Sequence, residues 1–170
     1  MSNTNTVSAD ANSVSAPAHV ADVVDVRGPR FAAWVTTAVL AAVLLIASVS
    51  PAAAGILLGL QAVVFAIGAF AGPRRHPYGR IFARLISPRL APVSATEPTA
   101  PLRFAQLVGL IFAVVGTIGF AVGAITVGLV ATGFALFAAF LNAAFGICLG
   151  CQIYPLVARL RRNNPATAQT

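Results

Sequence analysis

Two long stretches of this chain carry no charged side chain, and they constrain its fold more than any other feature. One runs from Phe31 to Pro73 and the other from Phe104 to Ala158, and they are 43 and 55 residues long. A helix needs about 20 apolar residues to cross the hydrocarbon core of a bilayer, so each stretch is long enough for two crossings. The composition agrees, because 58% of the residues are hydrophobic and only 9% are charged. We therefore predict a protein embedded in a membrane.

Each apolar stretch contains a place where a helix should end. Ser50-Pro51 divides the first stretch, because proline cannot donate a backbone hydrogen bond and restricts the residue before it. Gly119, Gly123 and Gly128 mark a weaker turn in the second. The predicted fold class is an all-α membrane protein with four transmembrane helices arranged as two hairpins, near residues 31–49, 52–72, 104–122 and 126–146.

The basic residues predict how the spans are oriented. All 11 are arginines, and they give a net charge of +7. They precede the first span, lie between the second and third, open the third and follow the fourth, whereas both hairpin tips have none. Because arginine and lysine accumulate in cytoplasmic segments, we expect both termini in the cytoplasm. The arginines interrupt apolar runs and do not line one basic face, so no nucleic-acid partner is expected.

A cleavable signal peptide is the competing interpretation of the first span. Arg27 and Arg30 precede an apolar stretch that ends near Ala52-Ala53-Ala54, which resembles a cleavage site. The polar leader is long, and the apolar stretch exceeds the core of a typical signal peptide. We therefore favour a first span that is retained.

The apolar spans and the arginines divide the chain into five segments. Residues 1–26 are expected to form a disordered cytoplasmic tail, 27–73 and 102–158 the two hairpins, 74–101 a cytoplasmic linker, and 159–170 a second tail. Within the linker, Ile81, Phe82, Leu85 and Ile86 recur at helical spacing, which predicts a short amphipathic helix ended by Pro88 and lying in the membrane interface. Residues 91–101 are expected to be a flexible connector. His76 is expected to be a solvated surface residue without a role, and His19, in the tail, is less informative still. The arginines expected to contact anionic headgroups are Arg74, Arg75, Arg80, Arg84 and Arg89.

The two hairpins have similar sequences, which indicates a possible internal repeat. Arg30-Phe31-Ala32 corresponds to Arg103-Phe104-Ala105, and Gly68, Gly72 and Pro77 correspond to Gly146, Gly150 and Pro155. Several glycines are spaced four apart, a pattern that allows close approach of membrane helices. We favour packing within one four-helix bundle, with a homodimer as the alternative.

Cys148 and Cys151 form the one group of residues with an evident chemistry. If the fourth helix continues through them, positions i and i+3 share a face, and the pair can cycle between dithiol and disulfide at the cytoplasmic edge of the membrane. Thiols are kept reduced on that side, so a resting dithiol is expected. Covalent haem attachment would need histidine where Gln152 stands, and a zinc site would need a dimer to supply four thiolates. Two small packing residues remain the alternative.

Several segments resemble a bacterial family of small integral membrane proteins, the domain of unknown function 4395. The likeness runs from about Asp25 to Leu160 and is carried by Val26 to Phe31, Gly72-Pro73-Arg74, Arg103-Phe104-Ala105 and, most specifically, Phe145 to Tyr154 with its Cys-Leu-Gly-Cys segment. The resemblance implies a location in the bacterial inner membrane. Members of the family are often encoded near thioredoxin-like proteins and sulfurtransferases, so it also implies thiol or sulfur traffic.

The leading hypothesis is thiol-redox or sulfur-handling chemistry at Cys148 and Cys151, with a thioredoxin-like or sulfurtransferase protein as partner. The alternative is a structural or assembly subunit of a membrane complex whose cysteines only pack. The sequence identifies no cofactor, whether a quinone or a metal.

Overall fold

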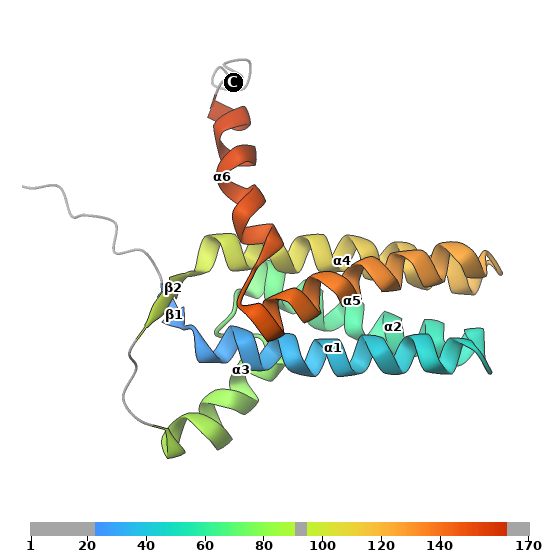
Figure 1. Cartoon of the computed structure of the whole chain (residues 1–170), viewed down its shortest axis with the longest axis horizontal. Coiled ribbons are helices and arrows are strands. Elements are labelled where there is room, and N and C mark those ends of the chain that lie inside the picture. Colours follow the sequence, from blue (N-terminus) through green and yellow to red (C-terminus); the bar gives the residue numbers. More distant parts are fainter. Residues whose placement is uncertain (1–22, 91–94, 163–170) are drawn as a thin grey trace, which may run out of the picture.

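Four long helices run side by side and dominate the architecture (Figure 1). The computed structural model describes residues 23–90 and 95–162. The long helices are α1 (Arg27–Ala47), α2 (Pro51–Ala66), α4 (Thr99–Ala121) and α5 (Ile125–Phe145). A turn of π-helix, η1 (Ile67–Ala71), extends α2. All four predicted helices are confirmed, and each is long and apolar enough to span a membrane. Both α1 and α4 begin about one turn earlier than predicted, because their arginine-bearing first turns are helical too.

The hairpin tips lie together at one end of the bundle (Figure 1). In the first tip, the Ser50 side chain accepts a hydrogen bond from the Ala53 amide at 3.3 Å, and Pro51 opens α2. This is a standard helix start, since an early amide would otherwise lack a partner. In the second tip, Gly123 adopts a φ of 80°, a conformation that side chains with a Cβ rarely take. The predicted breaks are therefore confirmed at Ser50-Pro51 and at Gly123.

The bundle core joins helices from different halves of the chain. The most extensive contacts are between α2 and α4, and between α1 and α5. Fully buried residues of the core include Leu40 and Val43 of α1, Leu58 of α2 and Ala113 of α4. Glycines let the backbones approach: a Cβ on Gly119 would lie 2.7 Å from the Gly128 amide nitrogen in the facing helix. These glycines pack within the bundle, as expected.

The outer surface of the bundle is apolar. Large hydrophobic side chains face outward on all four helices, among them Leu45, Ile56, Ile118 and Phe134. Contiguous exposed apolar surface on this scale suits lipid and not water. The chain is therefore a multi-pass membrane protein.

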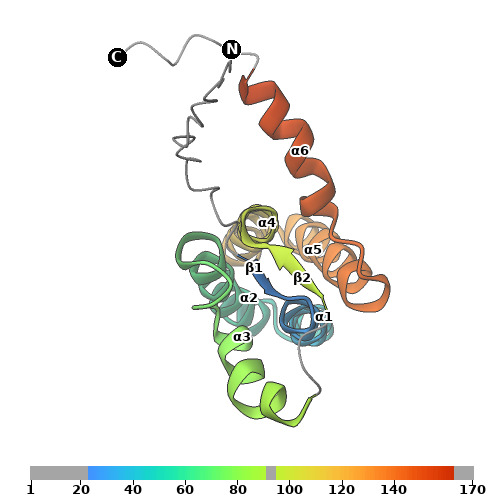
Figure 2. The same cartoon turned by 90° about the vertical axis from the view of Figure 1, so that its left-hand side faces the viewer.

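Shorter elements gather at the end opposite the tips. A linker helix, Pro77–Arg89, is built from α3 (Pro77–Ile81), the π-helical η2 (Phe82–Ile86) and the 3₁₀-helical η3 (Ser87–Arg89). A further helix, α6 (Leu149–Arg162), follows α5. Viewed from this end, the linker helix and α6 leave the bundle on opposite sides (Figure 2). Of the linker's apolar residues, Phe82 is buried against the bundle, whereas Ile81 and Leu85 remain exposed.

A two-stranded antiparallel sheet ties the start of the first hairpin to the start of the second. Strand β1 (Val23–Asp25) pairs with β2 (Thr96–Pro98), with Val24 opposite Glu97. These short segments fall in regions that we assigned to the tail and to the connector. Their pairing satisfies backbone groups that would otherwise need water. Residues 159–162 of the predicted second tail belong to α6, whereas residues 1–22, which include His19, and residues 91–94 and 163–170 lie outside the described residues.

The two halves repeat the same contacts, which supports the predicted internal repeat. Phe31 of α1 packs on Phe82 of the linker helix with ring centroids 5.8 Å apart, and Phe104 of α4 packs on Tyr154 of α6 at 6.0 Å. Each half thus consists of two long helices and one outward helix held by an aromatic pair. The linker helix and α6 are the corresponding third elements.

The ends of the second helices correspond at different residues from those we matched in the sequence. Gly72 ends η1 with a φ of 84°, and Gly146 ends α5 with a φ of 69°. The equivalent of Gly146 is therefore Gly72 and not Gly68. This shift places Arg74 at the position equivalent to Cys148.

Each half also supplies an arginine to the end of the other half's second helix. Arg103 of α4 donates from Nε to the Ala69 carbonyl at 3.0 Å and from Nη2 to the Phe70 carbonyl at 2.6 Å. Arg30 of α1 lies beside Gly146, where an added Cβ would be 3.3 Å from its Nη2. A positive charge is favourable at a helix C-terminus, where carbonyl groups lack intrahelical partners.

Candidate functional site at the arginine-rich end

The cysteine pair lies where α5 ends and α6 begins. Gly146 adopts the left-handed conformation and ends α5, so the chain leaves the helix for three residues before α6 starts at Leu149. Cys148 immediately precedes α6, and Cys151 lies in its first turn. The predicted end of the fourth helix near residue 146 is confirmed, because the left-handed glycine stops α5 there, so the helix does not continue through the cysteines. The close approach of the two residues nevertheless holds, since a helix start brings residues i and i+3 together.

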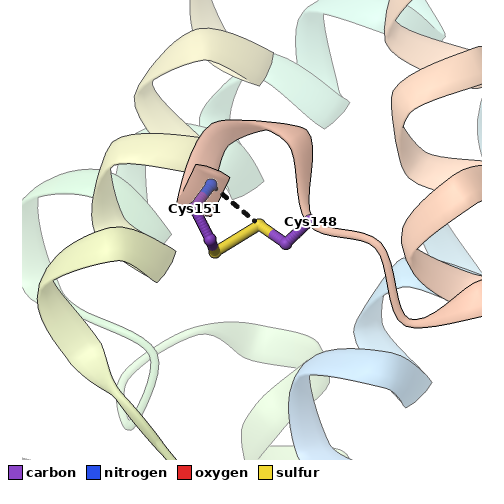
Figure 3. Close-up of a disulfide and its surroundings, with 2 residues drawn as sticks. All are labelled: Cys148 and Cys151. Atoms are coloured by element: carbon purple, nitrogen blue, oxygen red, sulfur yellow. Dashed lines mark hydrogen bonds between the residues drawn. A yellow bond between two sulfur atoms is a disulfide. The ribbon is translucent and has the colours of Figure 1, made fainter. Parts of the chain in front are cut away.

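The two sulfur atoms are in bonding contact as a disulfide, and the Cα atoms are 5.1 Å apart (Figure 3). The Cys151 amide also donates a hydrogen bond of 3.3 Å to Sγ of Cys148. Cys148 therefore takes the place of a helix-capping side chain, with sulfur where serine or aspartate would supply oxygen. Both cysteines are half-buried, so neither is sealed inside the bundle.

The pair is held against the first turns of α4. A Cβ on Gly150 would lie 2.6 Å from Cα of Ala105, so only glycine allows the first turn of α6 to approach α4 this closely. The Phe104–Tyr154 contact fixes the next turn of α6 to the same helix. The pair is thus positioned by the close packing of Gly150 on α4 and by an aromatic contact one turn further along α6.

One charged group beside the connection between α5 and α6 comes from α1. Arg30, which lies beside Gly146, also acts on Glu97. Burial raises the pKa of the Glu97 carboxyl, and the positive charge of Arg30 opposes that increase. Within residues 23–90 and 95–162, no group of three or more histidine, cysteine or acidic side chains could hold a metal ion.

His76 was expected to be a solvated surface residue, and this prediction is wrong. Its side chain is only 3% exposed, because the linker folds back against the end of α2 and the start of α4. Burial lowers the pKa of His76 from 6.5 to about 4, so the imidazole is neutral at physiological pH. The sequence carried no signal of this burial, since the residue stands between arginine and proline in a basic turn.

Gln61 makes a hydrogen bond between elements. The Tyr78 hydroxyl donates to Oε1 of Gln61 at 2.8 Å, which joins the linker helix to α2. Burial raises the pKa of Tyr78, so the hydroxyl keeps the proton that it donates. The tyrosine ring also meets the His76 ring edge to face, with centroids 5.3 Å apart. Buried His76 and Gln61 and half-buried Tyr78 therefore form a polar group that the sequence did not indicate.

Four candidate spans and a close CxxC pair define a small polytopic membrane protein with a pair of vicinal thiols at one end of its bundle. Residues 24–159 match the model of the family described as Domain of unknown function (DUF4395), and the chain belongs to this family. No curated protein and no solved structure matches the chain.

Proposed function

We propose that the protein exchanges thiols, or carries sulfur, through Cys148 and Cys151 with a thioredoxin-like or sulfurtransferase protein. The observation that supports this most directly is the geometry of the pair, with Cα atoms 5.1 Å apart and both side chains half-buried. The disulfide of such a pair can break and form again without movement of the helix bundle. It is also accessible to a second protein at the end of the molecule, away from the lipid-facing helices.

The structure favours different roles for the two cysteines. The amide hydrogen bond from Cys151 to the Cys148 sulfur stabilises negative charge there, so Cys148 is the proposed nucleophile. Its thiolate attacks a disulfide of the partner; a Cys148–partner bond forms, and the partner's second sulfur leaves as a thiolate. The Cys151 thiolate then attacks Sγ of Cys148 and releases the partner as a dithiol. The pair loses two electrons and the partner gains them.

Sulfur carriage would use the same nucleophile. The Cys148 thiolate would attack the terminal sulfur of a persulfide on a sulfurtransferase, and the donor's thiolate would leave. Cys151 would then release that sulfur as hydrosulfide by closing the disulfide. Both versions require a reactive Cys148 and differ in whether the partner delivers a disulfide or a persulfide.

We further infer that this end faces the cytoplasm of a bacterial cell. The arginines of the linker are exposed there, beside the starts of α1 and α4, and their positive charges suit anionic headgroups (Arg74, Arg75, Arg80, Arg84 and Arg89). A membrane-impermeant maleimide tests this orientation. It is applied to the triple variant Val49→Cys, Cys148→Ser, Cys151→Ser, in which the new cysteine replaces exposed Val49. Labelling of intact spheroplasts is expected. Labelling only after lysis would reverse the assignment.

Trapping of a mixed disulfide tests the exchange itself. The Cys151→Ser variant, expressed in its native host, should accumulate a covalent complex that reductant dissolves, because the second step is blocked. The matched Cys148→Ser variant should accumulate much less, and the double variant none. A complex that persists in the double variant would contradict the proposal.

An assembly role with non-reactive cysteines is the second candidate, and one observation favours it. The close contact between Gly150 and Ala105 shows that the segment of the pair also fastens α6 to α4. In this case both reduced thiols should react slowly with alkylating reagents in native membranes, and the double serine variant should lose α6 docking without losing any exchange activity.

A further inference from the structure

A cavity of about 380 Å³ lies at the arginine-rich end, and neither cysteine lines it. Its walls come from β1, the start of α1, the linker helix and the start of α4. They are largely apolar, with Val24, Ala32, Phe82 and Leu102 among the lining residues. The volume falls at the lower end of the range for small-molecule sites, roughly 300 to 1,000 Å³. It suits a ring-sized group and not a whole lipid.

Polar atoms without partners are buried at this cavity. His76 lines it, and within the described part of the chain neither Nδ1 nor Nε2 of its ring has a hydrogen-bond partner. Oε1 of Gln106, another lining residue, is likewise buried and unpartnered. Buried polar atoms are almost always satisfied, because leaving them unpaired is costly. These atoms therefore point to an occupant that both donates and accepts hydrogen bonds.

The backbone of η1, which extends α2, leaves room for these two side chains at Gly68. A Cβ on Gly68 would lie 2.7 Å from Cδ2 of His76 and 2.9 Å from Cγ of Gln106. Only glycine at this position lets imidazole and amide lie side by side against the helix. The fold therefore fixes the positions of the His76 and Gln106 side chains.

The charges around the cavity favour a neutral occupant. The His76 imidazole is neutral, and it offers one N–H donor and one nitrogen acceptor whichever tautomer it adopts. One carboxylate and one guanidinium also line the cavity, Asp25 and Arg74, and Asp25 forms a salt bridge of 3.1 Å with Arg27. A carboxylate or phosphate ligand would therefore meet both signs of charge.

We propose that this cavity binds the head group of a lipid-soluble quinone and its quinol. A quinone accepts a hydrogen bond from the His76 N–H, and a quinol hydroxyl donates to Oε1 of Gln106. The ring fits the cavity volume and its apolar walls, and the hydrocarbon tail dissolves in the bilayer that surrounds the bundle. The cavity is separate from the cysteine pair, which does not line it and whose intervening Gly150 packs on Ala105 of α4.

Photolabelling tests the site. The probe is an azido-benzoquinone with a decyl tail, applied to the full-length protein in phosphatidylcholine nanodiscs, with decyl benzoquinone and decyl naphthoquinone as competitors. We expect saturable labelling within residues 73–87, and a loss of at least tenfold in apparent affinity in His76→Leu. Ala83→Phe should cause a similar loss, because exposed Ala83 lines the cavity and a ring there fills it while keeping every polar group. The matched control is Ala52→Phe, at the exposed hairpin tip.

Three results would overturn the proposal. Labelling that does not saturate, or that maps to the lipid-facing helices, would mean that the cavity holds solvent only. Labelling of Ala83→Phe equal to that of the unmodified chain would place the probe elsewhere. Competition by palmitate or phosphatidic acid but not by decyl benzoquinone would assign an anionic ligand. The double variant Cys148→Ser, Cys151→Ser should keep full labelling, so failure of the thiol proposal and failure of this one are separable.

Discussion

The backbone amide of Cys151 donates a hydrogen bond to the sulfur of Cys148, 3.3 Å away, at the first turn of α6. The bond runs in one direction only, so it makes two residues that look equivalent in the sequence chemically unequal. Amide donors at a helix start favour negative charge on the group that accepts from them.

Alkylation rates should reveal this inequality. After reduction, Cys148 is expected to react with iodoacetamide severalfold faster than Cys151, because its thiolate accepts the amide hydrogen bond. Mass spectrometry of quenched time points in native membranes measures both rates. Cys151→Ser should leave the rate of Cys148 nearly unchanged, since the backbone amide remains. Equal rates for the two thiols would contradict this assignment.

Gly150 should not tolerate a side chain. In Gly150→Ala the new Cβ would meet Cα of Ala105 at 2.6 Å, so α6 must move, and we expect a loss of about 1 to 3 kcal/mol in the free energy of unfolding. Gly133→Ala is the matched control, because nothing lies within 4 Å of its added Cβ and alanine is the better helix former. Thermal unfolding in detergent should show a lower Tm for the first variant only.

Arg103 should stabilise the end of the first hairpin. Arg103→Gln removes the hydrogen bonds that the guanidinium donates to the Ala69 and Phe70 carbonyls, which have no partner within their own helix. We expect the free energy of unfolding to fall by about 1 to 2 kcal/mol. Arg84→Gln, on the exposed linker helix, removes the same charge and should have little effect on unfolding. Comparable Tm values for the two variants would rule out the capping role.

Acid should destabilise the fold through His76. Its pKa is 6.5 in the unfolded chain and about 4 in the folded one, so the folded state keeps the imidazole neutral while the unfolded state binds a proton. Stability is therefore complete above about pH 6.5 and is lost as the pH falls towards 4, by at most roughly 3.5 kcal/mol at about 1.4 kcal/mol per pKa unit. Tm measured from pH 7 to 5 should fall less steeply in His76→Gln, which has no such proton to bind.

The spans could be predicted because membrane insertion depends on local properties, namely apolar length and the breaks at Ser50-Pro51 and Gly123. The closeness of Cys148 and Cys151 could also be predicted, since three residues of separation suffice in a helix start as in a helix interior. Their exact setting could not, because the start and direction of α6 beyond Gly146 depend on packing of Gly150 against Ala105.

The burial of His76 could not be read from its neighbours. It requires the linker to turn back onto the end of α2 and the absence of a side chain at Gly68, and both are tertiary features. Likewise, β1 and β2 are far apart in the sequence and too short to carry an alternating pattern. Long-range pairing of this kind leaves no periodic signal.

The exchange of arginines between the two halves has a consequence for biogenesis. When the first hairpin leaves the ribosome, Arg103 has yet to be synthesised. The carbonyl groups at the end of that hairpin therefore lack their hydrogen-bond donor in the membrane interface. They are satisfied only when α4 inserts beside α2, and Arg30 in turn meets its position at Gly146 only once α5 is complete. Each inserted hairpin thus completes the other during folding. A ribosome that stalls between them would leave an unfinished protein for quality-control proteases to recognise.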